Sequence, residues 1–230
     1  MEKKKICLFC HYDKDGIYSQ DDINFISSLS STFEEVVVLT SNKERVDKKN
    51  FSNVKYSLGI PNRGLDFGKV QNFLENNDID NYDEFYIVNN SCILARDLSP
   101  SLKFMQKKGL DFWGYTTSKE IQLHVQTYFY FLNNKAYKEF RKLLNKEDPF
   151  GKNLSYDQVI RQIEVNMLSY FNSVGLKCGS YIHSHKIKTN KLDNLSFFYP
   201  DWLLLNPHYP FIKKKSIKIG FERKYLESFL

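Results

Sequence analysis

The chain has 230 residues and a formal net charge of +6, and 42% of its residues are hydrophobic. This composition can bury a substantial core, and no apolar run has the length of a membrane span or signal peptide. We therefore expect one domain over residues 1–230, cytoplasmic and either soluble or peripheral on the inner face of the cytoplasmic membrane. The mildly basic charge suits phosphates or an anionic membrane surface, but the scattered lysines do not form the basic stripe of a nucleic-acid binder.

Short apolar runs alternate with helical patterns in the first half of the chain. Strands are predicted at "KICLF" (5–9), "EVVVL" (35–39), "VKYS" (54–57) and "EFYIV" (84–88), and helices over 21–31, after Gly68 and from the cap Ser99. This alternation predicts an α/β fold with a mostly parallel central sheet and helices on both faces.

The second half begins with two more predicted strands, "DFWGY" (111–115) and "VQTYFYFL" (125–132). A capping box formed by Ser155 and Gln158 then predicts a helix that ends at Gly175. The polar stretch 183–191 is expected to be a loop, and a basic C-terminal tail begins at about 212.

Four cysteines, Cys7, Cys10, Cys92 and Cys178, are expected to be reduced thiols in a cytosolic protein. The CxxC of the first pair lies at a strand end and far in sequence from the other two, so a zinc site is not predicted. The pair His183 and His185 lacks further ligands at suitable spacing for a metal.

Three polar loops follow the predicted parallel strands: "HYDKDG" (11–16), "PNRGLDFG" (61–68) and "NNS" (89–91). In open α/β sheets, ligands bind beyond the carboxyl ends of the strands. We therefore expect these loops to converge on one binding site. In the second loop, Arg63 and Asp66 stand beside Gly64 and Gly68, which is consistent either with a solvated turn or with close approach of an anionic ligand at a helix N-terminus.

Seven short blocks in the same order resemble the rhamnan synthesis protein F family. The resemblance spans about residues 6–213 and is carried by "HYDKDG", "NRGLDFG", "NNS", "DFWG", "HVQTYF", "IEVNMLSYF" and "PFIKK". It implies a GT-A-like, Rossmann-type fold and an enzyme that moves a sugar, with rhamnose as one candidate, from a UDP- or dTDP-sugar to a growing bacterial surface polysaccharide or lipid-linked glycan.

The resemblance also implies residues that bind the nucleotide-sugar donor. These are His11, Asp13, Asp15, Arg63, Gly64, Asp66, Asn89, Asn90, Ser91 and Lys213. On the acceptor side it suggests Trp113, His124 and Gln126, although core packing is the more frequent role of a tryptophan and the two polar residues could equally be structural.

The family usually has Asn-Asp-Ser where this chain has Asn89-Asn90-Ser91. Mg²⁺ and Mn²⁺ prefer carboxylate oxygens, so no metal cofactor is firmly predicted, with Asp13 or Asp15 left as alternative ligands. Lys213 could neutralise the donor diphosphate instead, unless the lysine run is merely a solvated tail.

Glu164 is the candidate catalytic base. At 100° per residue it falls beside Ile160, Met167 and Phe171, and a carboxylate among apolar residues needs a partner or a task. An ion pair with Arg161 is the structural alternative, and Asp111 is the second candidate for the base.

The sequence thus favours a glycosyltransferase whose partners are a nucleotide-sugar, a glycan or lipid-linked acceptor and other glycosyltransferases. The departure at Asn90 supports an alternative function, a non-catalytic nucleotide-sugar-binding domain that supports a partner transferase.

Overall fold

A mixed β-sheet forms the centre of the molecule. The computed structural model describes residues 3–46, 51–183 and 194–218. Its main sheet has the order β3-β2-β1-β4-β8-β6-β7, and β9 pairs with β6. The strands of this sheet are β1 (Lys5–His11), β2 (Glu35–Thr40), β3 (Val54–Ser57), β4 (Glu84–Asn89), β6 (Phe112–Ser118), β7 (His124–Val125), β8 (Phe129–Asn133) and β9 (Cys178–Ile182).

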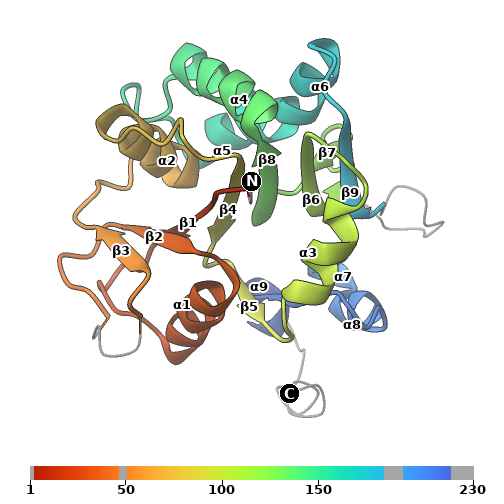
Figure 1. Cartoon of the computed structure of the whole chain (residues 1–230), viewed down its shortest axis with the longest axis horizontal. Helices are drawn as coiled ribbons and strands as arrows, with labels where there is room; N and C mark the ends of the chain where they lie inside the picture. The colour runs from red at the N-terminus through yellow and green to blue at the C-terminus, as the bar shows by residue number, and fades with distance from the viewer. Residues whose placement is uncertain (1–2, 47–50, 184–193, 219–230) are drawn as a thin grey trace.

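Helices cover both faces of this sheet, as Figure 1 shows. One face carries α2 (Leu65–Asn76), α4 (Asn134–Glu147), α5 (Tyr156–Val159), a π-helical turn η2 (Ile160–Glu164) and α6 (Val165–Ser173). The other face carries α1 (Gln20–Thr32), α3 (Ser99–Gln106), α7 (Leu195–Phe198), α8 (Pro200–Leu204) and α9 (Lys214–Lys218), with the small sheet of β5 (Cys92–Leu94) and β10 (Phe211–Lys213). None of the helices in the described ranges is long and apolar enough to cross a membrane.

The predicted α/β architecture is confirmed. Pairings among β3, β2, β1 and β4 are parallel, as expected for strands buried on both faces. Alternate side chains of β1 enter two separate cores: Cys7 and Phe9 pack toward α1, whereas Ile6, Leu8 and Cys10 pack toward α2.

The second half of the sheet differs from the sequence prediction. The strand expected over 125–132 is interrupted by a turn that separates β7 from β8, and β8 runs antiparallel to both β4 and β6. Helix α4 was not predicted, although Asn133 caps it and Tyr137, Phe140 and Leu144 are buried at helical spacing. The third predicted helix begins one residue earlier than predicted, because Ser99, the expected cap, is its first residue and Leu98 is its N-cap.

The basic run near the C-terminus is not a free tail at its start. Phe211–Lys213 form strand β10, which pairs antiparallel with β5 beside the end of β4. The backbone N–H of Lys214 then donates to the Ser91 carbonyl at 2.9 Å. The lysines that follow Ile212 are therefore fixed against the carboxyl edge of the sheet.

The two glycines around Arg63 are explained by packing inside the protein. Gly64 has φ 63°, and a methyl group there would overlap the Pro149 carbonyl. A methyl group on Gly68 would overlap the carbonyl of Arg63. These glycines let the start of α2 lie against the turn at 149–151, so close approach of a ligand is not needed to explain them.

Two glycine substitutions distinguish the stability lost to a steric clash from the stability lost to backbone strain. Gly64 and Gly109 have similar φ values of 63° and 60°, but nothing lies within 4 Å of a methyl group at Gly109. Gly109→Ala should cost about 1–2 kcal/mol of stability from the left-handed backbone alone. Gly64→Ala should cost roughly 3–4 kcal/mol, because overpacking is added to that strain. Urea unfolding measures both, and equal losses would show that contact with Pro149 is unimportant.

Candidate functional site

A cleft of about 210 Å³ lies at the carboxyl edge of the parallel strands. The N-terminus of α2, the segment after β4, the turn before β8, the π-helical turn and the segment that begins with β10 form its walls. Its lining includes Asp66, Asn89, Ser91, Thr127, Tyr128, Tyr156, Ile160, Glu164, Lys213 and Lys215. The predicted loops 61–68 and 89–91 therefore do converge, and Glu164 and Lys213 lie in the same cleft.

Two larger cavities, of about 410 and 340 Å³, lie at the opposite edge. Each contains one ion pair, Lys3 with Glu84 at 3.2 Å in the first and Lys55 with Glu35 at 2.8 Å in the second. In the carboxyl-edge cleft two cations share one wall, and no described carboxylate lies within 4 Å of the ammonium of Lys213 or Lys215. Unpaired cations and the carboxyl-edge position both favour the smaller cleft as a ligand site.

Asp66 forms the acidic wall of the cleft, and a hydrogen bond from the last residue of β4 holds its carboxylate. Asn89 donates from its amide nitrogen to an Asp66 carboxylate oxygen at 2.8 Å. Burial raises the pKa of Asp66, while Lys69 and the Asn89 hydrogen bond oppose the rise and the Glu164 carboxylate adds to it. Lys69 is fully buried, donates to Asn62 at 2.6 Å, and has its pKa lowered by burial against the opposing charge of Asp66.

Glu164 stands at the end of the π-helical turn, and its side chain is 21% exposed. A π-turn forms hydrogen bonds five residues apart, so the regular 100° wheel does not hold through 160–164. As a result Glu164 lines the cleft, whereas the wheel placed it in an apolar arc. The expected alternative pairing is absent, because Arg161 is exposed and no ion pair joins these two described residues.

His124 lies behind Glu164 and is buried. Its Nδ1 is 2.9 Å from the Gln122 carbonyl, which can only accept, so Nδ1 carries a proton. Its Nε2 is 3.9 Å from Glu164 Oε1. A proton on either partner makes this contact attractive. The Thr127 backbone N–H donates to the same carboxylate oxygen at 3.4 Å.

The basic wall consists of two lysines held over aromatic rings. Lys213 Nζ lies 5.1 Å from the ring centroid of Tyr128, and Lys215 Nζ lies 5.8 Å from that of Tyr156. Both distances are in the range of cation–π attraction. The lysine between them, Lys214, points the other way and donates to Asp22 Oδ1 at 2.8 Å.

Asp22 joins this basic segment to the rest of the edge. It is 3% exposed and accepts from Ser19 Oγ at 2.6 Å, while His11 Nε2 lies 3.5 Å away. Asn90 Nδ2 is 3.4 Å from it. Burial acts to raise the pKa of Asp22, but the nearby His11 ring and hydrogen bonds from Lys214 and Ser19 outweigh that effect and hold the pKa well below its usual range.

Several predicted donor-binding residues have structural partners instead. His11 belongs to β1 and not to a polar loop; it is fully buried, with Nδ1 3.1 Å from Thr40 Oγ1. Asp13 accepts from the backbone of Asp15 at 2.9 Å and so closes its own turn, and Asp15 is exposed. Asn90 donates to the Tyr12 carbonyl at 3.1 Å and does not line the cleft.

Arg63 does not face the cleft. Its guanidinium donates to the Gly151 carbonyl at 2.8 Å and lies 5.4 Å from the centroid of the Phe150 ring. The expected grouping of Arg63 with Asp66 is therefore wrong for this conformation, and the cation beside Asp66 is Lys69.

Asp111, the second candidate base, lies at the other edge of the sheet. It precedes β6, whose first residue Phe112 pairs with Leu132, and it accepts from Asn133 at 2.6 Å and from the Lys177 backbone at 2.7 Å. The structure thus leaves Glu164 as the carboxylate candidate that faces the cleft together with Asp66.

The acceptor-side candidates are also buried. Trp113 is 1% exposed and stacks on Phe131 with ring centroids 5.7 Å apart, so it packs in the core. Gln126 accepts from Thr116 at 2.7 Å and donates to Asn194 at 3.0 Å. His183 lies 3.0 Å from Ser180 Oγ, and His185 falls outside the described residues.

The sequence analysis missed Asp22, Lys69, Tyr156, Thr127 and Lys215. Asp22 could have been found from Ser19, because the pair forms a capping box with Asp at the position where Glu or Gln is usual. Thr127 and Tyr156 carried no signal of their own. No three His, Cys, Asp or Glu side chains in residues 3–46, 51–183 and 194–218 gather so as to hold a metal.

Comparison with known proteins gives one clear similarity. A family model described as rhamnan synthesis protein F matches residues 36–226. Comparison with curated proteins gives no match.

Two solved structures are similar at low identity. A glucose-1-phosphate thymidylyltransferase from Bacillus anthracis is 10% identical, with 77% of this chain and 86% of that chain covered and a TM-score of 0.48. A 4-diphosphocytidyl-2C-methyl-D-erythritol synthase from Anaerococcus prevotii is 14% identical, with 82% and 93% covered and a TM-score of 0.45. Similarity at this level carries no argument about activity.

The Asp22 network predicts a pH-dependent loss of stability. Because the folded-state pKa of Asp22 is lowered, its contribution is present above the unfolded pKa of about 4 and is lost as the pH falls below that value. Asp22→Asn should cost roughly 3 kcal/mol at pH 7, and the difference from wild type should shrink below about pH 4. Asp21→Asn, one residue away, is the control. A difference that does not vary with pH would contradict the charge network.

Proposed function

Because the chain belongs to the rhamnan synthesis protein F family, we propose that it is a glycosyltransferase of bacterial polysaccharide synthesis. It would move a sugar from a nucleoside diphosphate donor, UDP- or dTDP-linked, to a growing surface polysaccharide or lipid-linked glycan. The observation that carries the proposal is the carboxyl-edge cleft, in which Asp66 and Glu164 face unpaired Lys213 and Lys215.

The basic wall suits the donor diphosphate. Lys213 and Lys215 hold two positive charges at one side of the cleft, and each lies over an aromatic ring. When the bond from the anomeric carbon to the diphosphate oxygen breaks, negative charge develops on that oxygen. Fixed cations at this position stabilise such charge at no cost of reorganisation.

The acidic wall suits the acceptor and the transferred sugar. Asp66 is an acceptor for sugar hydroxyl groups, held in place by Asn89. Glu164 takes the proton of the acceptor hydroxyl as the new carbon–oxygen bond forms. His124 Nε2, on the other side of the carboxylate, is a positioning group that can share this proton.

A group of unsatisfied polar atoms supports a nucleoside position at the same edge. Asn42, just beyond β2, is 4% exposed, and neither atom of its side-chain amide has a hydrogen-bond partner among the described residues. The buried hydroxyls of Ser41 and Tyr56 are also without partners. Buried polar groups are nearly always bonded, and an amide offers the adjacent donor and acceptor that a pyrimidine edge can pair with. We assign the base to this end of the site.

The volume of the cleft limits what it holds. At about 210 Å³ it is smaller than the roughly 300–1,000 Å³ of pockets that enclose a whole ligand of drug size. It would therefore enclose the diphosphate and sugar, while the nucleoside extends along the edge toward Asn42.

Glu164→Gln tests the catalytic role. The substitution keeps the shape and removes the charge, so it should lower turnover by roughly 10²–10⁴-fold while binding of UDP or dTDP stays unchanged. Turnover is read as release of nucleoside diphosphate from UDP- and dTDP-sugars, and binding by calorimetry. Asp157→Asn, an exposed carboxylate on α5, is the matched control.

Normal turnover in Glu164→Gln would remove the residue from the mechanism. Binding of donor without turnover in the wild type would favour the alternative, a non-catalytic binding domain.

The basic wall and the metal requirement are tested together. Lys213→Ala with Lys215→Ala should weaken UDP or dTDP binding about 10- to 100-fold, more so at low salt. Lys142→Ala on α4, whose ammonium pairs with Glu139, should have no effect. Because Asn89, Asn90 and Ser91 offer no carboxylate, we expect binding to survive EDTA. Loss of binding in EDTA and its recovery with Mn²⁺ would overturn the metal-independent proposal.

A further inference from the structure

Four large apolar side chains are exposed within eight residues of α7, α8 and the residue that follows. Phe198 is 57% exposed, Tyr199 39%, Trp202 43% and Leu205 77%. Single exposed apolar residues are ordinary, but a contiguous group of this size marks an interaction surface. We call these four residues the aromatic rim.

The exposed apolar surface continues onto α3. Phe104 is 48% exposed, and its ring meets that of Tyr181 edge-on with centroids 5.6 Å apart. The Tyr181 hydroxyl donates to the side chain of Asn206 at 2.9 Å, directly after the last residue of the rim. Lys108 Nζ lies 4.6 Å from the Phe104 ring centroid. These contacts join the rim and α3 into one surface.

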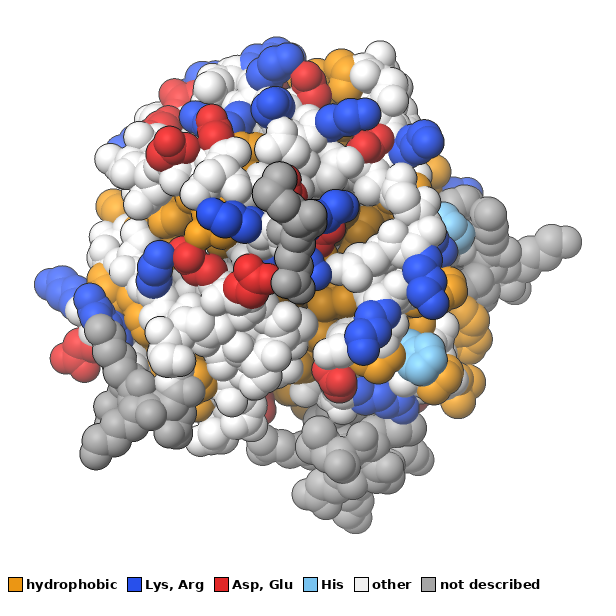
Figure 2. Space-filling model, viewed as in Figure 1, with side chains coloured by type: hydrophobic (Ala, Val, Ile, Leu, Met, Phe, Trp, Pro, Cys, Tyr) orange, Lys and Arg blue, Asp and Glu red, His pale blue; other side chains and the backbone are white. Residues whose placement is uncertain are grey.

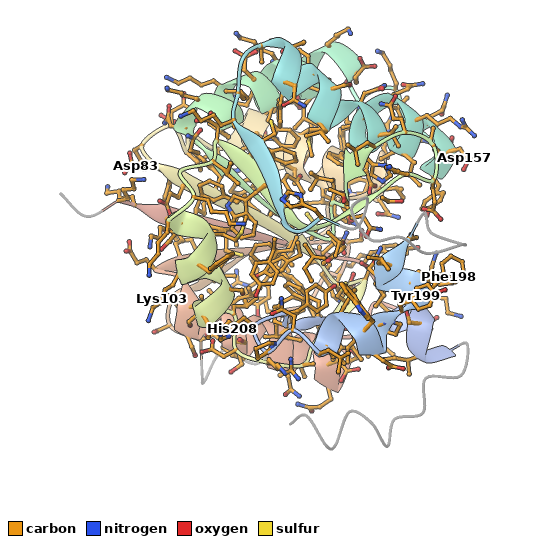
Figure 3. All side chains as sticks on the ribbon, turned by 90° about the vertical axis from the view of Figure 1, so that its right-hand side faces the viewer. Asp83, Lys103, Asp157, Phe198, Tyr199 and His208 are labelled. Carbon is orange, nitrogen blue, oxygen red and sulfur yellow. The ribbon has the colours of Figure 1, made fainter. Side chains whose placement is uncertain are left out.

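Basic residues accompany this surface. Lys103, Lys107 and Lys108 are exposed on and just after α3. Figure 2 shows Lys and Arg side chains gathered beside hydrophobic ones at the lower right, where Figure 1 places α3 and α8. In Figure 3, Lys103, His208, Tyr199 and Phe198 follow one another across the lower half of the molecule. Aromatic rings with lysines beside them are typical of segments that lie in a membrane interface.

The rim also lies next to the cleft. Ser216, one residue after Lys215, donates to the carbonyls of Ser196 and Phe197 at 3.3 and 3.0 Å. Gln126, one residue before Thr127, bonds to Asn194 and Ser196. Figure 3 places Phe198 and Tyr199 on the same side as Asp157 of α5, and Asp83 at the opposite side. A surface bound to the rim would therefore reach the mouth of the cleft.

We propose that the aromatic rim and the lysines of α3 dock the protein on an anionic lipid surface. Trp202, Phe198 and Leu205 would enter the interface, while the ammonium groups of Lys103, Lys107 and Lys108 meet the lipid head groups. Each lysine near an anionic surface adds about 1 kcal/mol of attraction. The first lysines of the basic tail are not part of this contact, because Lys213 and Lys215 line the cleft and Lys214 binds Asp22; residues 219–230 fall outside the described residues. It does not depend on the chemistry proposed for the cleft.

Vesicle co-sedimentation of the full chain tests this docking. The wild type should bind vesicles of phosphatidylcholine with about one third phosphatidylglycerol, and bind pure phosphatidylcholine weakly. The double variant Trp202→Ser, Leu205→Ser should lose at least about tenfold in binding to the anionic vesicles. Lys103→Glu with Lys107→Glu should lose binding to anionic vesicles only, and high salt should have the same effect.

Val174→Ser is the matched control, because this residue is 43% exposed at the end of α6 on the other layer. It should bind vesicles like the wild type. Equal binding by the rim variants would overturn the proposal and assign any membrane contact to another part of the chain. Absence of vesicle binding would also overturn the proposal. A concentration-dependent dimer that the rim substitutions abolish in light scattering would show that the surface is a protein interface instead. Urea unfolding of each variant establishes that folding is unchanged.

Discussion

The ion pair between the buried carboxylate of Asp22 and the partly buried ammonium of Lys214 is the contact on which the candidate site depends. The Asp22 carboxylate belongs to the first turn of α1, and the Lys214 ammonium comes from a segment 192 residues later in the chain. Breaking a buried pair by removing one partner is costly because it leaves an uncompensated charge. The pair therefore fixes the segment after β10 against the carboxyl edge, and with it the two neighbouring lysines that line the cleft.

The same constraint explains why successive side chains of the lysine run point in alternating directions. Backbone pairing of β10 with β5 sets the direction of Lys213, and the Lys214 N–H bond to Ser91 continues that pairing. Lys214 then points to Asp22, while its two neighbours face the cleft and rest over Tyr128 and Tyr156. The Asp22 carboxylate thus pairs with one of the three ammonium groups, that of Lys214, and the other two remain available to a ligand.

The two carboxylates of the acidic wall, Asp66 and Glu164, have different surroundings. Burial raises the pKa of Asp66, and the Asn89 hydrogen bond and the buried Lys69 oppose this rise without cancelling it. Glu164 has only the Thr127 N–H and the imidazole of His124 close by. The different roles proposed for these two acids rest on their positions: Asp66 is tied to Asn89 at the end of β4, whereas Glu164 faces the cleft from the π-helical turn.

The sequence alone determined the elements whose signals are local. Continuous β-branched runs such as 35–39, the capping box at Ser155 and the loops after β1 and β4 follow from residue preferences over a few positions, and the structure has them. The convergence of Asp66 and Asn89 was also predictable, because parallel strands end at the same edge of a sheet. Only the tertiary structure decided the rest. Gly64 and Gly68 looked like ligand-binding positions until Pro149 and Arg63 were seen to occupy their space. Arg63 turned to Gly151, and the π-turn moved Glu164 into the cleft. Asp111 fell at the opposite edge because it precedes β6, which runs in the same direction as β4. Each outcome depends on which distant residue fills the neighbouring volume or pairs with the charge, and a linear pattern does not contain that information.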